Sequence, residues 1–157
     1  MLIDTTLREG AQMFGTSIPQ EARIEIASRI ASMGVEEIEI GWMGQKGLEE
    51  LVQALRGRGV TCDLSVWSPC RTVDVYRAAG LGIDTINIGL PVSDLHIAER
   101  LRTDRNGLTT MLRETVAVGR LACLTNEGGA VGYKKRASAL QQRLVADAQA
   151  QVQLARA

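Results

Sequence analysis

Polar and charged side chains that could take part in chemistry gather where short apolar runs of this sequence end. The first group, Asp4-Thr5-Thr6-Leu7-Arg8-Glu9-Gly10-Ala11-Gln12, follows the apolar start of the chain. A guanidinium such as Arg8 can hold a carboxylate through two hydrogen bonds or stabilise a developing oxyanion. The adjacent Glu9 offers the hard oxygen ligand that a divalent cation prefers. This pair suits an anionic substrate and a cation, and the alternative is a surface Arg–Glu pair beside a loop.

Three further groups follow at later apolar runs. Glu39 lies inside an alternating segment, Arg71 follows the next apolar run, and Ser93-Asp94-Leu95-His96 follows a fourth. Taken singly, each has a simpler explanation: Glu39 on the exposed face of an edge strand, Arg71 paired with Asp74, and His96 as a surface or capping residue. Their shared position favours function, because chemistry in parallel sheets collects at the carboxyl ends of the strands.

The elements that must position these groups alternate between strand and helix. Period-two or short apolar patterns predict strands over residues 1–4, 37–41, 64–67 and 85–89. Helical spacing predicts helices carrying Ala22, Ile26, Ile30 and Met33; Leu48, Leu51, Val52 and Leu55; Val73, Tyr76 and Ala79; and Leu108, Met111, Leu112, Thr115 and Val116, with a short helix from Ser93. Ser17 and Gln20 have the spacing of a capping box before the first of these helices.

Strands alternating with helices predict right-handed βαβ units and a parallel sheet, either doubly wound or a (β/α)8 barrel. A complete barrel needs roughly 250 residues, and this chain of 157 residues offers four clear units and a doubtful fifth. We therefore expect the amino-terminal half of a TIM barrel over residues 1–120. Residues 121–157 are expected to form a divergent fifth unit, with at best a short strand at 131–133 and a helix over 137–157.

Composition narrows the class of protein. The chain has 18 basic and 18 acidic residues and is 45% hydrophobic, so it is neither a disordered chain nor one with the charge that nucleic acid or an anionic membrane attracts. It lacks the long apolar run of a membrane span, and its polar start is unlike a signal peptide. Three cysteines without metal-site spacing favour the reducing cytoplasm, where they serve as small apolar residues.

The first polar group also carries a family resemblance. Leu2-Ile3-Asp4-Thr5-Thr6-Leu7-Arg8-Glu9-Gly10-Ala11-Gln12 resembles the D-T-T-L-R-[DE]-G-x-Q opening of the pyruvate-carboxyltransferase-like metallolyase superfamily. This superfamily includes homocitrate, 2-isopropylmalate and citramalate synthases and hydroxymethylglutaryl-CoA lyase. Residues 34–41 resemble its G-V-x-x-I-E-x-G element, and residues 90–96 its P-x-S-D-x-H element. Residues 67–71 and the Met43-Gly44 step are most similar to homocitrate synthases associated with nitrogen fixation.

The resemblance implies a (β/α)8 barrel that binds Mg²⁺, Mn²⁺ or Zn²⁺ and condenses acetyl-CoA with a 2-oxo acid. It implies that Glu9 is a metal ligand and that Arg8 is catalytic, stabilising the oxyanion on the keto oxygen. It places Gln12 and Glu39 in the substrate pocket. Arg71 and His96 are weaker candidates for contacts with substrate or coenzyme.

Two departures from the family bear on activity. The family takes further metal ligands from an H-x-H pair, whereas His96 is the only histidine here. Where the family has a V-G-x-E-D-x-S-R element, residues 131–138 read V-G-Y-K-K-R-A-S, with lysines in place of acids. We expect a partial homocitrate-synthase-like acyltransferase that is inactive alone and either self-associates or pairs with a separate carboxyl-terminal half. The alternatives are a decayed gene product, a non-catalytic half-barrel that oligomerises or binds a partner, and an isopropylmalate- or citramalate-type choice of 2-oxo acid.

Overall fold

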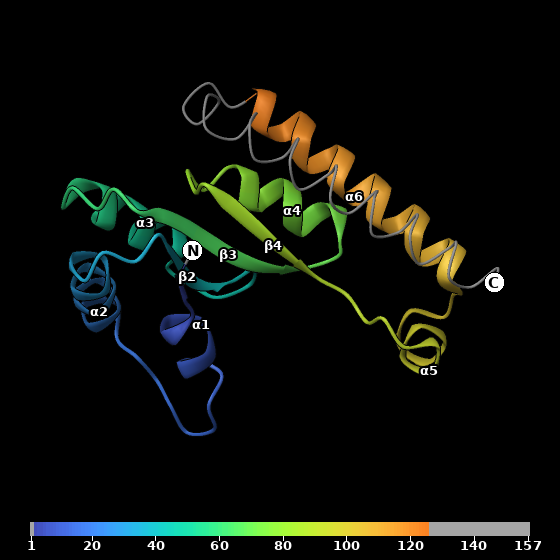
Figure 1. Cartoon of the computed structure of the whole chain (residues 1–157), viewed down its shortest axis with the longest axis horizontal. Coiled ribbons are helices and arrows are strands. Elements are labelled where there is room, and N and C mark those ends of the chain that lie inside the picture. Colours follow the sequence, from blue (N-terminus) through green and yellow to red (C-terminus); the bar gives the residue numbers. More distant parts are fainter. Residues whose placement is uncertain (1, 126–157) are drawn as a thin grey trace.

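A single parallel sheet organises the part of the chain that the computed structural model describes, residues 2–125 (Figure 1). Its four strands lie in chain order: β1 (Ile3–Asp4), β2 (Glu37–Trp42), β3 (Asp63–Pro69) and β4 (Thr85–Gly89). The helices are α1 (Thr6–Gly10), α2 (Gln20–Ser32), α3 (Leu48–Gly57), α4 (Thr72–Ala79), α5 (Asp94–His96), the π-helical turn η1 (Ile97–Leu101) and α6 (Arg105–Thr125). The predicted α/β architecture with parallel βα units is confirmed.

The two faces of the sheet differ in polarity. Ile38 pairs with Leu64, and Val66 with Ile86, and these side chains belong to the apolar core beneath the helices. Side chains alternate along a strand, so Glu39 and its partner Ser65 lie on the opposite face. The sheet therefore has one face that anchors helices and one face that carries polar groups.

The helices bury apolar residues against the sheet, though not always those expected. In α3, Leu48, Leu51, Val52 and Leu55 are buried, as their spacing predicts. In α4, Val75 and Ala78 are buried, whereas Val73 and Tyr76 are 52% and 62% exposed. The apolar residues of α4 lie on more than one side of the helix. The contacts of α4 with β3, β4 and α6 determine which side is buried. Figure 1 shows α6 running along the outside of α4.

The start of the chain corrects two local expectations. The segment after β1, where no helix was expected, contains the short helix α1. The predicted capping box is wrong, because α2 begins at Gln20 with Pro19 as its N-cap and no side-chain capping bond. The Gln20 amide instead donates to the carbonyl of Gly47 at 2.7 Å, which ties α2 to the loop before α3.

The end of the described region bears on the expected fifth unit. α6 (Arg105–Thr125) is the last element of the described region. The strand expected at 131–133 and the helix expected over 137–157 lie outside the described residues. Within residues 2–125, none of the helices combines the length and apolarity needed to cross a membrane.

Candidate functional site

Arg8 is the centre of a polar cluster at the carboxyl ends of the first three strands. It lies on α1, directly after β1, and forms an ion pair with its neighbour Glu9. Its Nε lies 3.6 Å from Oε2 of Glu39 on β2. Its Cζ lies 5.4 Å from the ring centroid of Trp67 on β3, within the range of a cation–π interaction. Side chains from three successive βα units therefore meet at one guanidinium.

The turn between β1 and α1 is fixed by local hydrogen bonds. The Asp4 carboxylate accepts from the backbone N–H of Thr6 at 3.0 Å and from its hydroxyl at 3.1 Å. These bonds start α1 immediately after β1. Arg8 therefore lies one helical turn beyond Asp4, at the carboxyl end of the sheet. Leu7, fully buried, anchors the same turn in the core.

Glu39 is held in place by the next strands of the sheet. Its side chain is only 7% exposed. The amide of Asn87 on β4 donates to Oε1 of Glu39 at 2.9 Å and lies 3.4 Å from the hydroxyl of Ser65. The two carboxylate oxygens therefore have different neighbours, Asn87 on one side and Arg8 on the other. The alternative of an exposed edge position for Glu39 is wrong, because β2 lies between β1 and β3.

The ring of Trp67 lies across β4 at Gly89. A Cβ on residue 89 would come within 2.6 Å of the indole Cε2, closer than real carbon contacts allow. Only glycine leaves room for the ring in this position. The β2–β3 pairing is also irregular between Glu39 and Trp42, and such bulges are common beside functional sites.

The metal-binding capacity of the described residues is limited to one clear ligand. Glu9 has a 57% exposed side chain and can present a carboxylate oxygen, which suits a hard divalent cation. The oxygens of Asp4 already accept hydrogen bonds from Thr6. Within residues 2–125, no three His, Cys, Asp or Glu side chains lie close enough together to hold a metal ion. The donor type fits, and the remaining ligands have to come from outside the described residues or from substrate and water.

The other predicted site residues are less closely joined to this cluster. Gln12 is exposed, and its backbone N–H donates to the carbonyl of Glu9 at 3.1 Å. Arg71, 66% exposed, forms a 2.6 Å ion pair with Asp74 at the start of α4, the local pairing that its spacing offered. His96 is exposed at the end of α5, and its backbone N–H donates to the hydroxyl of Ser93.

The structure adds three residues to the site that were not among those predicted from the sequence: Ser65, Trp67 and Asn87. The pattern that could have revealed them is the strand alternation itself. Counted in register, Ser65 and Trp67 on β3 and Asn87 on β4 fall in phase with Glu39. Polar residues in phase on neighbouring strands indicate a shared polar face.

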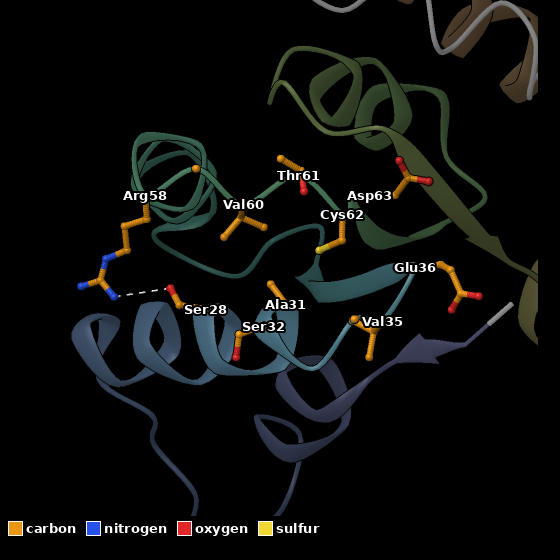
Figure 2. A pocket seen from close by; sticks show the side chains of 12 residues that line it. Ser28, Ala31, Ser32, Val35, Glu36, Arg58, Val60, Thr61, Cys62 and Asp63 are labelled. Carbon is orange, nitrogen blue, oxygen red and sulfur yellow. Dashed lines mark hydrogen bonds between the residues drawn. The ribbon is translucent and has the colours of Figure 1, made fainter.

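An open groove of about 580 Å³ lies at the other end of the sheet (Figure 2). It is lined by the end of α2 and by the segments that lead into β2 and β3, and so lies at the amino ends of these strands. Figure 2 shows Arg58 reaching across it to the hydroxyl of Ser28, a contact of 3.4 Å. The groove shares no residue with the Arg8 cluster.

Comparisons with known proteins agree with this geometry. The chain is 34% identical over 116 residues to the homocitrate synthase subunit alpha of Clostridium pasteurianum, covering 73% of this chain and 43% of that protein. It is 36% identical over 109 residues to a putative (R)-citramalate synthase of Methanoculleus marisnigri, covering 69% of this chain and 22% of that one. The chain thus spans less than half the length of these relatives.

A solved structure supports the fold. An HMG-CoA lyase from Acenitobacter baumannii, in complex with coenzyme A and 3-methylmalate, matches with a TM-score of 0.58 at 20% identity. The match covers 73% of this chain and 39% of the lyase chain, as expected for part of a TIM barrel. The HMGL-like family profile matches residues 1–150. The resemblance carried by the Arg8–Glu9 motif is confirmed, and the chain belongs to the HMGL-like family.

Proposed function

We propose that this chain supplies the Arg8 side of the active site of an acyltransferase that condenses acetyl-CoA with a 2-oxo acid. The observation that carries the proposal is the placement of Arg8, whose guanidinium is held beside Glu39 and Trp67 while 18% of its side chain remains exposed. A cation fixed in advance at the carboxyl end of a parallel sheet favours negative charge there without reorganising. Condensation at a keto carbon places such charge on the keto oxygen.

Arg8 holds the developing oxyanion in this proposal, and Glu39 keeps the guanidinium in place and faces the substrate pocket together with Gln12. Glu9 is the chain's ligand for a divalent metal ion, which when bound polarises the keto group. Arg71 and His96 contact substrate or coenzyme at the margin of the site. Removing one oxyanion-stabilising group typically lowers the rate by about 100- to 1,000-fold, and we expect a loss of that order for Arg8→Gln.

The first choice of 2-oxo acid is 2-oxoglutarate, which would give homocitrate. It is supported by the relative from Clostridium pasteurianum, whose name is homocitrate synthase subunit alpha. The word subunit in that name also supports a second polypeptide here, and we propose that it is a carboxyl-terminal half that adds the missing ligands. β1 and β4 are the outer strands of the sheet within residues 2–125, and a complementary half would pair with their free edges.

The test combines this chain with a carboxyl-terminal half from a homocitrate synthase relative and measures thiol release from acetyl-CoA. We expect release that depends on a divalent metal, is fastest with 2-oxoglutarate, and falls at least 100-fold in Arg8→Gln. Arg29→Gln is the matched control, because Arg29 is 79% exposed on α2 and pairs only locally with Glu25. Faster release with 2-oxoisovalerate or pyruvate would change the substrate to the isopropylmalate or citramalate type. An assembled pair, verified by sedimentation, that releases no thiol with any of the three acids would refute the proposal.

A further inference from the structure

We propose that β4, which carries neither Arg8 nor Glu9, positions the Arg8 guanidinium through two side chains, one on β2 and one on β3. Asn87 acts through Glu39, and Gly89 acts through Trp67. The effect on substrate binding rests on the function proposed above, whereas the effect on Arg8 itself does not. Asn87, Gly89 and Trp67 are thus positioning residues in this proposal.

The first arm of the proposal is the set of contacts that leads from Asn87 through the Glu39 carboxylate to Arg8. Asn87 donates to Oε1 at 2.9 Å, and the same carboxylate lies 3.6 Å from the Nε of Arg8 through Oε2. A carboxylate fixed on one oxygen presents its second oxygen in a defined direction. The Asn87 amide also lies 3.4 Å from the hydroxyl of the fully buried Ser65, which limits its own rotation. Loss of the Asn87 amide would free the Glu39 carboxylate to turn.

The second arm is the set of contacts that leads from Gly89 through the Trp67 ring to Arg8. The ring occupies the space that a side chain at residue 89 would fill, and its centroid lies 5.4 Å from the Arg8 Cζ. A cation–π interaction depends on the cation lying over the ring face. A methyl group at residue 89 would push the indole away from β4 and so change the surface on which Arg8 lies.

The contacts of Arg8 make it sensitive to both arms. Among the described residues, its buried Nε finds no hydrogen-bond acceptor at hydrogen-bonding distance. Apart from the ion pair of its terminal nitrogen with the adjacent Glu9, its location depends on the charge of Glu39 and the face of Trp67, because Nε makes no short directional bond. Moving either neighbour moves the guanidinium.

The primary experiment is nuclear magnetic resonance of the full 157-residue chain, following the Arg8 Nε–H and the Trp67 indole N–H. The signals are assigned with Arg8→Lys and Trp67→Phe. We expect Gly89→Ala to shift both resonances, because the ring current of Trp67 on Arg8 changes. In the pair assembled with the carboxyl-terminal half, we expect it to weaken 2-oxoglutarate binding by about 5- to 10-fold. Gly57→Ala is the matched control, since a Cβ there meets nothing within 4 Å. It is expected to leave both resonances and the binding unchanged.

A second pair of variants tests the arms separately. Asn87→Ala is expected to shift the Arg8 Nε–H, whereas Thr85→Ala, also on β4, is not. In a Trp67→Leu background, Gly89→Ala is expected to have no further effect on Arg8, because the ring that transmits the collision is gone. Should Gly89→Ala unfold the chain, its refolding in the Trp67→Leu background would support the collision, and continued unfolding would overturn it.

The outcomes separate the two proposals. Arg8 and Trp67 resonances that stay in place in Gly89→Ala, as in Gly57→Ala, would overturn the positioning role of Gly89. An unmoved Arg8 resonance in Asn87→Ala would overturn the role of Asn87. Shifted resonances in the chain, together with an assembled pair that releases no thiol with any 2-oxo acid, would support the positioning role and count against the proposed function alone.

Discussion

Arg23 is a buried cation that joins α2 to the carboxyl end of β2, and its removal should destabilise the chain. It is 4% exposed and lies beneath the loop that leads from β2 to α3. Its guanidinium donates to the carbonyl of Ile40 at 3.3 Å, to the carbonyl of Lys46 at 3.1 Å and to the side chain of Gln20 at 2.9 Å. Burial lowers the pKa of Arg23, the direction expected when a charged form is removed from water.

Two opposing effects set the magnitude for Arg23→Met, which keeps much of the apolar stem. Two backbone carbonyls lose their donor, and an unsatisfied buried acceptor costs about 1–3 kcal/mol. The buried Nε has no acceptor among the described residues, so removing this unsatisfied donor raises the free energy of unfolding by about 1–3 kcal/mol. The carbonyls outnumber the unsatisfied donor, and we expect a net loss of about 2 kcal/mol in the free energy of unfolding.

The assay is urea unfolding followed by circular dichroism. It compares two quantities between variants: the urea concentration at the midpoint and the slope with which the free energy of unfolding falls with urea. Arg29→Met is the matched control on the same helix, because Arg29 is 79% exposed and its pair with Glu25 contributes at most about 1 kcal/mol. A lower midpoint for Arg23→Met than for Arg29→Met, at equal slopes, is the expected result. Equal midpoints, or a more stable Arg23→Met, would show that desolvation of the cation outweighs its hydrogen bonds and would refute the reasoning.

Three further predictions concern stability and reactivity. Leu55→Ala, at a fully buried position on α3, should lower the free energy of unfolding by about 2–5 kcal/mol in the same urea assay. Met33→Ala is the control, because Met33 is 78% exposed, and it should change the free energy by less than about 0.5 kcal/mol. Similar losses in the two variants would contradict the burial of Leu55 in the core. The backbone N–H of Leu2 donates to the Glu36 carboxylate at 2.6 Å and holds its pKa below the ordinary 4.5. This stabilisation is present above pH 4.5 and is lost as the pH falls through the lowered pKa. Glu36→Gln should therefore lower Tm near neutral pH and leave it unchanged in strong acid. A difference in Tm that persists in strong acid would point to another cause. Burial raises the pKa of the Cys70 thiol, so in a Cys62→Ser, Cys123→Ser background its labelling near neutral pH should be much slower in the folded chain than in denaturant, and equal rates would argue against burial.

Local sequence patterns determined the elements of this protein and their order. Thr85–Gly89 forms a strand with the predicted bounds, because its short alternating run stands between the turn with Gly80 and Gly82 and the break at Pro91. The face of α3 was equally readable, since four apolar residues at helical spacing leave one side to bury. The Arg8–Glu9 motif identified the family, because its residue types are adjacent in the chain and need no folding to be recognised.

Only the tertiary structure decided which polar groups meet. Glu39 and Asn87 are 48 residues apart, and their hydrogen bond depends on the register of three parallel strands, which no local pattern specifies. The burial of Arg23 also eluded the sequence, because a charged residue on an amphipathic helix is ordinarily placed in solvent. Side-chain types and local periods are properties of the chain, whereas the partner of a buried charge is a property of how the strands and helices pack.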